Sequence, residues 1–223
     1  MRSTLSFKAY IAISFVYLLL IILGREDISW FIKPFLIPFL ILAVYSCGDF
    51  PSKKFLSIAL TFSWMGDIVL MFAYKAEIYF IIGLVAFLIS HIAYIILFSK
   101  QLRINSFRNK AIFWVGITAI IVYLVVMFLL LLPTLGDLKI PVLAYAIILS
   151  TMLLFAFKGY LKWSKPAGTY ILLGATIFVS SDSILAFNKF YEPIIFSSFL
   201  IMATYLLAQY FIVVGILKLN RKK

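Results

Sequence analysis

The segment Thr61-Phe62-Ser63-Trp64-Met65-Gly66-Asp67-Ile68-Val69-Leu70-Met71-Phe72 decides the fold, because it is an apolar run with one carboxylate embedded in it. A carboxylate at the centre of a membrane-spanning helix costs about 2.5–3.5 kcal/mol on insertion scales, so another interaction must offset that cost. One other segment, residues 174–187, repeats the arrangement and carries Asp182. Asp67 and Asp182 are therefore the first candidates for a functional site. The other acidic residues lie in or beside short polar breaks: Glu26, Asp27, Asp49, Glu77, Asp137 and Glu192.

The composition indicates an integral membrane protein. Of the 223 residues, 65% are hydrophobic and 13% are charged, which is more apolar side chain than a soluble domain of this size can bury. No small-residue cleavage site follows the first apolar run, residues 7–23, so we expect a transmembrane helix there and not a signal peptide. Cys47 is the single cysteine and His91 the single histidine, so the sequence predicts neither an internal disulfide nor a metal site.

The apolar runs predict an all-α protein with eight transmembrane helices in one domain, residues 1–223. With the N-terminus on one side, that side carries fifteen Lys and Arg residues and the other side carries five. This asymmetry predicts that both termini are cytoplasmic, and we expect a bacterial cytoplasmic membrane. The net charge of +12 does not indicate nucleic-acid binding, since no soluble basic domain presents it. The expected helices are 7–23, 31–46, 55–73, 78–98, 111–132, 140–157, 167–187 and 194–217.

The ends of these spans set the expected depths of the polar residues. Asp67 lies about seven residues, or roughly 10 Å, below the outer boundary, and Asp182 lies about five residues, or roughly 8 Å, below it. Lys33 is expected to open the second span at that boundary, and Pro38 to bend the helix that follows. Gly66 allows a neighbouring helix to approach closely. The basic loop 101–110 is expected to anchor anionic lipid at the cytoplasmic surface.

Two groups of polar residues follow from this counting. His91 and Gln209 lie nearer the cytoplasmic end, each one turn from a tyrosine, Tyr94 and Tyr205 respectively. The remaining candidates converge toward a polar cavity in the non-cytoplasmic half: Lys33, Asp67, Tyr145, Asp182 and Asn188.

Structural explanations stay open for several of these residues. Lys33 is also typical of a lysine whose side chain extends to the membrane interface, and Tyr145 is also typical of a packing residue. A membrane carboxylate or His91 also serves as a hydrogen-bond partner between helices. The spans 7–23 and 111–132 contribute no candidate, and the latter is expected to be a lipid-facing wall.

The ordered set of motifs resembles the YhhN-like lysoplasmalogenase family over nearly the whole chain. The matching positions are Lys33-Pro34 with Pro38, Gly66-Asp67 with Leu70, Gly83 through Phe87 to His91 and Tyr94, Tyr145 with Met152, Gly174-Ala175 through Ser181-Asp182 to Leu185, Asn188 and Phe190, and Tyr205 with Ala208-Gln209. The resemblance implies an eight-helix membrane enzyme that hydrolyses the vinyl ether bond of lysoplasmalogens. The implied products are a fatty aldehyde and a glycerophospho-ethanolamine or -choline. A parallel repeat of four plus four helices is a further expectation.

Two carboxyl groups suit this chemistry. Acid cleavage of a vinyl ether protonates the β-carbon, and water then captures the resulting oxocarbenium ion. The reaction needs a proton donor and a nearby anion, the roles that paired carboxyl groups fill in glycoside hydrolysis. Asp67 and Asp182 are the expected catalytic pair, and the sequence leaves open which is protonated and which is charged. No metal or organic cofactor is required, and the expected partners are a lysophospholipid substrate and membrane lipids.

Two other classes of protein fit the same residues. Carboxylates, a lysine and a histidine inside a helical bundle are also typical of a proton-coupled transporter of a small solute or lipid. The third class is a structural membrane protein in which the polar residues only hold helices together. A panel of lysophospholipids with and without vinyl ether linkages distinguishes the enzyme from both.

Overall fold

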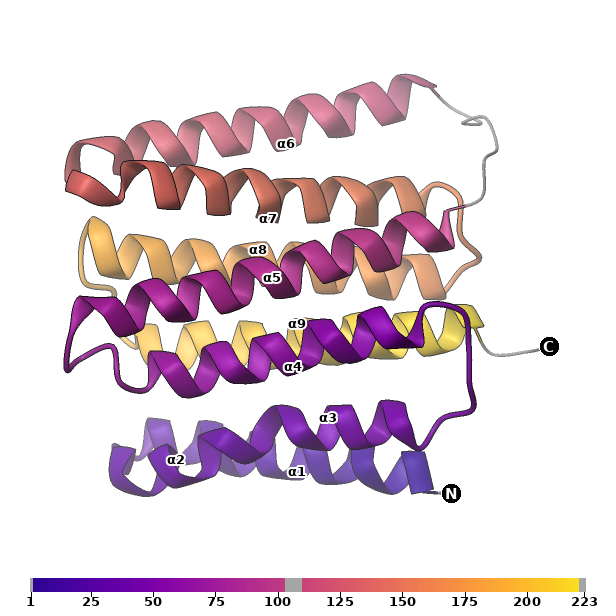
Figure 1. The fold of residues 1–223 in the computed structure, drawn as a ribbon, viewed down its shortest axis with the longest axis horizontal. Coiled ribbons are helices and arrows are strands. Elements are labelled where there is room, and N and C mark those ends of the chain that lie inside the picture. Colours follow the sequence, from indigo (N-terminus) through magenta and orange to yellow (C-terminus); the bar gives the residue numbers. More distant parts are fainter. Residues whose placement is uncertain (1, 103–109, 221–223) are drawn as a thin grey trace. The chain divides into compact units, whose positions relative to one another are not determined.

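The structure is a computed structural model, and it describes residues 2–102 and 110–220 (Figure 1). Every regular element in these two ranges is helical, which confirms the all-α prediction. The contacts divide the chain into two compact units, Met1–Leu97 and Phe98–Lys223, and each is described below by itself. Most of the basic loop expected at 101–110 lies outside the described residues, as do the last three basic residues of the chain. The single domain and the four-plus-four repeat stay predictions.

The first unit begins with α1 (Arg2–Ile22), which packs against α3 (Leu36–Tyr45). A short helix, α2 (Glu26–Ile32), and a 3-10 turn, η1 (Lys33–Phe35), lie between them. α4 (Lys53–Leu70) follows and packs against α3, and α5 (Glu77–Gln101) continues past residue 97 into the second unit.

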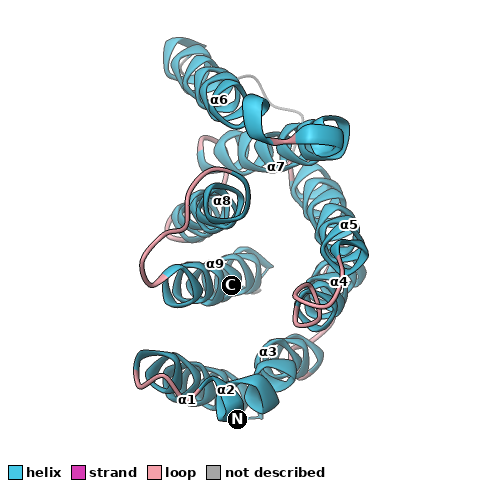
Figure 2. Ribbon diagram, turned by 90° about the vertical axis from the view of Figure 1, so that its left-hand side faces the viewer, coloured by secondary structure: helices cyan, strands magenta, loops and turns pink. Residues whose placement is uncertain are grey.

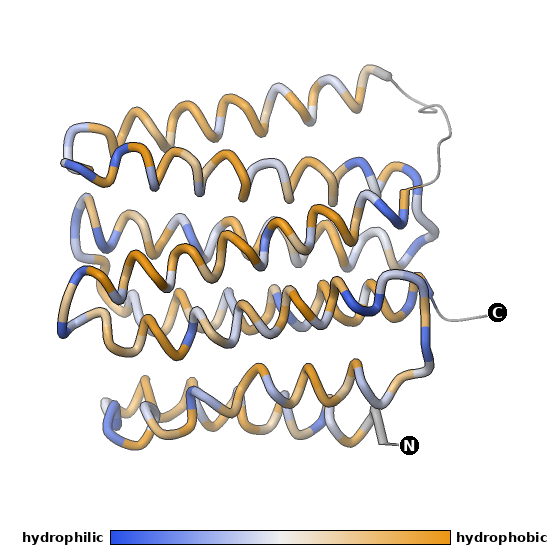
Figure 3. Tube along the Cα trace, viewed as in Figure 1, coloured by the Kyte–Doolittle hydropathy of each residue, from blue (hydrophilic) through white to orange (hydrophobic). Residues whose placement is uncertain are grey.

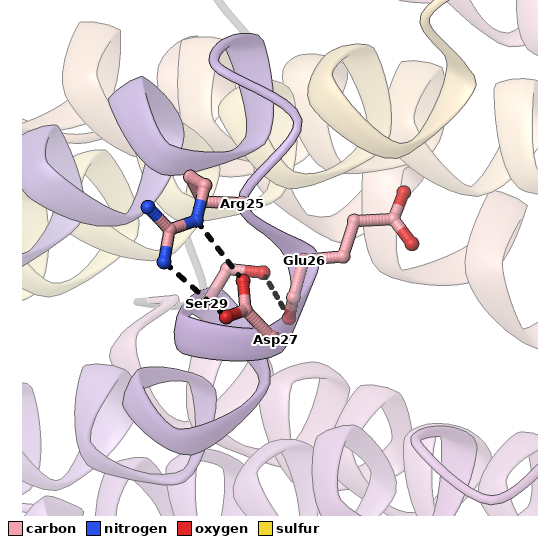
Figure 4. A network of polar contacts seen from close by, with 4 residues as sticks. All are labelled: Arg25, Glu26, Asp27 and Ser29. Carbon is pink, nitrogen blue, oxygen red and sulfur yellow. Dashed lines mark hydrogen bonds and ion pairs between the residues drawn. The ribbon is translucent and has the colours of Figure 1, made fainter.

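The second transmembrane segment begins earlier than the sequence predicted, at Glu26 and not at 31. Two acidic residues occupy the first turn of α2, where the helix dipole favours negative charge. Figure 4 shows how this turn is held: Arg25 donates from Nε and Nη2 to the Asp27 carboxylate at 3.3 and 3.4 Å, and Ser29 Oγ donates to the Glu26 carbonyl at 3.1 Å. Lys33 therefore lies seven residues, about 10 Å, inside the segment and does not open it.

The break in this segment also lies elsewhere than predicted. The helix is interrupted at Lys33–Phe35, whereas Pro38 is the third residue of α3. Because Pro38 has no N–H, the Pro34 carbonyl four residues earlier loses its helical donor. The indole Nε1 of Trp64 on α4 donates to that carbonyl at 2.7 Å. The two prolines thereby provide the acceptor for a side-chain contact between η1 and α4.

Two glycines bring α4 and α5 close together. A Cβ atom built on Gly66 would lie 2.7 Å from the ring of Phe87, and one built on Gly83 would lie 2.6 Å from Leu70. Close packing through small residues is the usual way in which helices associate in lipid. The prediction that Gly66 admits a neighbouring helix is confirmed.

The second unit holds α6 (Lys110–Leu131), α7 (Lys139–Tyr160), α8 (Ala167–Phe190) and α9 (Ser197–Asn220). Two 3-10 turns, η2 (Leu132–Thr134) and η3 (Gly136–Leu138), connect α6 to α7. α6 packs on α7, α7 on α8, and α8 on α9, in the order that Figure 2 shows. A Cβ atom on Gly174 would lie 2.9 Å from the Ala208 carbonyl, so the backbones of α8 and α9 nearly touch.

The chain is a multi-pass membrane protein. Apolar residues fill the helices and hydrophilic ones gather at helix ends (Figure 3). α4 has 18 residues, and three charged side chains, Lys53, Lys54 and Asp67, make it less apolar than the other spans. With α4 the described helices give eight candidate spans, while the side on which each terminus lies stays a prediction. Among the described residues, seven other segments are long and apolar enough to cross a membrane: Leu5–Ile22, Glu26–Tyr45, Glu77–Gln101, Ala111–Thr134, Gly136–Tyr160, Ala167–Phe190 and Ser197–Asn220.

Candidate active site

Asp67 is a buried carboxylate near the end of α4. Its exposed fraction is 4%, and it lies three residues before Leu70, where α4 ends. The sequence predicted seven residues, but α4 ends earlier: the Met71 N–H is shared between the Asp67 and Ile68 carbonyls, and the N–H groups of Phe72 and Ala73 donate three residues back, to Val69 and Leu70. Asp67 is therefore closer to its helix end than expected.

A lysine lies within electrostatic range of this carboxylate. The Lys33 ammonium, half-buried at the break between α2 and α3, interacts with Asp67 through space. Within residues 2–102 and 110–220, Lys33 makes neither a hydrogen bond nor an ion pair within 4 Å. Two candidates from different segments of the chain are thus neighbours in the first unit. The Lys33 ammonium therefore has its hydrogen-bond donors available to a second anion.

Two tyrosines of α1 also interact electrostatically with Asp67, and the sequence interpretation missed both. Tyr10 and Tyr17 have exposed fractions of 2% and 4%. Ser14, between them, is buried as well, so α1 presents a polar stripe at positions i, i+4 and i+7. That spacing was the available signal in a segment that is apolar from Tyr10 to Ile22 except at Ser14.

His91 and Tyr94 are fully buried on α5. Ser90, beside His91, exchanges a 2.8 Å hydrogen bond with Ser63 and donates to the Ala59 carbonyl at 2.8 Å. Ala59 lies eight residues, about 12 Å, before Asp67 on α4. His91 is therefore nearer the Lys53 end of α4 than Asp67 is, which agrees with the order that the sequence predicted.

Asp182 accepts a hydrogen bond from a tyrosine in the second unit. The Tyr145 hydroxyl on α7 donates to Asp182 Oδ2 on α8 at 2.5 Å, the short distance typical of an O–H group bonded to a carboxylate. Both residues lie inside candidate spans. The structure thus joins two candidates that the sequence proposed separately. Spacing within one helix carries no information about this pairing between helices.

Tyr123 on α6 is a second tyrosine near this carboxylate. Its hydroxyl forms a short hydrogen bond with Ser183, the residue after Asp182, and it interacts electrostatically with Asp182. Ser183 Oγ in turn donates to the Val179 carbonyl at 2.5 Å. The outer face of α6 agrees with the predicted lipid-facing wall, since only 6% of its span is buried. Tyr123 is the exception, and the only signal for it was a phenol group near the middle of an almost wholly apolar helix.

Three further candidates of the second unit have distinct surroundings. Tyr205 is 3% exposed and forms an edge-to-face contact with Phe178, with ring centroids 5.6 Å apart. Gln209 is fully buried on the same helix. Asn188 Oδ1 accepts the Ile194 N–H at 2.9 Å, so it orders the loop between α8 and α9.

The end of α8 also differs from the prediction. α8 continues to Phe190, so Asp182 lies eight residues before its end and not five. The predicted span ended at 187 because Asn188 and Lys189 are polar. Asn188 instead stays helical and uses its side chain to hold the following loop.

In each unit a carboxylate lies near phenol groups within a candidate span. Asp67 has Tyr10, Tyr17 and the Lys33 ammonium as electrostatic neighbours, and Asp182 has Tyr145 and Tyr123. Among the described residues, no group of three or more His, Cys, Asp or Glu side chains is placed to hold a metal ion. Carboxyl and phenol groups donate and accept protons, and a carboxylate also stabilises a nearby positive charge.

The sequence matches the YhhN family over residues 28–216, which is more than half of the chain. The chain belongs to the YhhN family. The matched range runs from α2 into α9 and contains all nine candidate residues, whereas α1 precedes it with Tyr10 and Tyr17. Comparisons with curated proteins and with solved structures gave no match. Membership confirms the resemblance on which the expected activity depends, and it is consistent with a hydrolase.

Proposed function

We propose that this YhhN protein is a lysoplasmalogenase, which hydrolyses the vinyl ether bond of a lysoplasmalogen. The products are a fatty aldehyde and a glycerophospho-ethanolamine or -choline. Family membership supports the proposal, and the observation that carries it is the Tyr145–Asp182 hydrogen bond inside the membrane spans. A membrane carboxylate that serves chemistry needs a polar environment of this kind.

The proposed reaction consumes one water molecule and needs no cofactor. A carboxylic acid donates its proton to the β-carbon of the vinyl ether, and positive charge develops on the carbon bonded to oxygen. Water adds to that carbon and loses a proton, which gives a hemiacetal. The hemiacetal then breaks its bond to the glycerol oxygen, which takes up a proton, and releases the aldehyde. A carboxylate near the cation lowers the barrier, as in glycoside hydrolysis.

The contacts of the two aspartates support a division of roles. Asp182 accepts a hydrogen bond from Tyr145, which suits the carboxylate that stabilises the cation. By elimination we propose Asp67 as the proton donor, in which case the substrate phosphate must compensate the nearby Lys33 ammonium, because that charge alone favours the ionised carboxylate. Lys33 is the proposed counter-ion for the substrate phosphate, since a lysine meets a phosphate as a point charge without fixed geometry. The remaining candidates, His91, Tyr94, Tyr205 and Gln209, are proposed to contact the aliphatic tail.

The test compares two substrates that differ at one linkage. Purified protein is incubated with a lysoplasmalogen and with the ester-linked lysophospholipid of the same head group, and aldehyde release is measured. We expect aldehyde from the vinyl ether substrate alone. No aldehyde from a folded protein would contradict the proposal. Proton-coupled uptake into vesicles by that same preparation would favour the transporter.

A further inference from the structure

A surface cavity of about 490 Å3 lies on the first unit, beside the N-terminal half of α4. One face of α4 lines it with Lys54, Ser57, Ile58, Thr61 and Phe62, and we call it the Lys54 cavity. These positions recur every three or four residues, so they form one stripe that runs about 12 Å along the helix.

One wall of the Lys54 cavity is built by Lys53 and the loop after α3. The Lys53 ammonium donates to the Cys47 carbonyl at 2.8 Å and to the Tyr45 carbonyl at 3.5 Å. It also forms an ion pair with Asp49, 3.3 Å away, so the charge of that carboxylate is already compensated. The Lys53 ammonium is therefore bound by groups of the protein, and these contacts hold the loop that forms this side of the cavity.

Lys54 is the third charged residue that lines the cavity, beside Asp49 and Lys53. Its side chain is exposed, and in the described part of the chain it makes no hydrogen bond or ion pair. Along α4 the lining continues from Lys54 and Ser57 to Ile58, Thr61 and Phe62. A cation and a hydroxyl residue thus lie at one end, and two apolar side chains with Thr61 between them line the rest of this helix face. This gradient matches a molecule with an anionic head and an aliphatic chain.

We propose that the Lys54 cavity binds an anionic glycerophospholipid of the surrounding membrane. The phosphate is bound by the Lys54 ammonium and the Ser57 hydroxyl, and one acyl chain lies along Ile58 and Phe62. The charge distribution predicts that this end of α4 faces the cytoplasm, where anionic lipids attract basic groups. Lys54 precedes Asp67 by thirteen residues, about 20 Å along α4, so this site is separate from the proposed active site. The proposal holds whatever reaction the protein catalyses.

The test is native mass spectrometry of the full-length protein with added phosphatidylglycerol or phosphatidylcholine. We expect the unaltered protein to retain one phosphatidylglycerol in preference to phosphatidylcholine, and Lys54→Gln to weaken that binding roughly tenfold. Lys8→Gln is the matched control, since it removes an exposed lysine of the same predicted membrane face outside the cavity. Ile58→Trp fills the apolar part and should lower lipid retention with both lysines intact.

Three results would overturn the proposal. Lys54→Gln should keep the fold because the side chain is exposed, so unchanged phosphatidylglycerol binding in this variant would exclude Lys54 as the phosphate ligand. An equal loss in Lys8→Gln would indicate attraction by net charge and not a site. Competition by soluble glycerol 3-phosphate at the concentration of the lipid would show that the acyl chain contributes nothing. We expect no such competition.

Discussion

At the scale of single residues, Asp182 depends on the phenol that donates to it. Tyr145→Phe removes the hydroxyl and keeps the ring, so the 2.5 Å hydrogen bond is lost with little change in packing. A hydrogen bond to a charged group contributes about 1.5–3 kcal/mol, which corresponds to a decrease in kcat of about 10- to 150-fold. Steady-state aldehyde release measures it, with the exposed Tyr191→Phe as the control. Unchanged kcat in Tyr145→Phe would mean that the contact only joins α7 to α8.

Lys33 allows a second test at this scale, because its proposed role is in binding and not in proton transfer. Lys33→Ala should raise KM roughly tenfold with a smaller effect on kcat, since a phosphate contact is made equally in the ground and transition states. Lys139→Ala, an exposed lysine at the start of α7, is the control. If His91→Ala abolished turnover in a folded protein while Lys33→Ala left KM unchanged, the roles of the two residues would be misassigned.

At the scale of elements, the packing of α8 against α9 depends on Gly174. A methyl group there would lie 2.8 Å from the Ile212 nitrogen and 2.9 Å from the Ala208 carbonyl oxygen, and backbone atoms cannot yield as side chains do. Gly174→Ala should therefore destabilise the protein by about 1–3 kcal/mol, the usual cost of overpacking. Thermal unfolding in detergent measures the change. Gly48→Ala is the control, because nothing lies within 4 Å of its Cβ position. Equal Tm values for the two variants would contradict the close contact.

The elements also show what the sequence could predict. Both aspartates were found because a charge inside an apolar run is conspicuous, and Gly66 because small residues permit close packing in lipid. The start of α2 at Glu26 was missed because adjacent acidic residues were interpreted as a loop, although they stabilise a first helical turn. Tyr10 and Tyr123 were missed because the chain has thirteen tyrosines, and only contacts between helices distinguish those near a carboxylate.

At the scale of the whole molecule, the charge asymmetry predicts an even number of crossings. α4 is the span on which the count depends, because its three charges make it the least apolar. Reporter fusions after Lys223 and in the turn at Asp137 should report opposite sides of the membrane, with the C-terminal fusion cytoplasmic. Both fusions on one side would show that a span is miscounted.

The central claim is that two membrane carboxyl groups carry out vinyl ether hydrolysis, and kcat for Asp67→Asn and Asp182→Asn on one lysoplasmalogen tests it most directly. Asn keeps the shape and removes the acidic proton, so each variant should insert and fold normally but lose at least about 100-fold in kcat. The double variant should lose little more than either single one, since groups that act in one step are not additive. Asp137→Asn, at an exposed residue of the η3 turn, should retain full activity. Near-normal turnover in either single variant would contradict the claim.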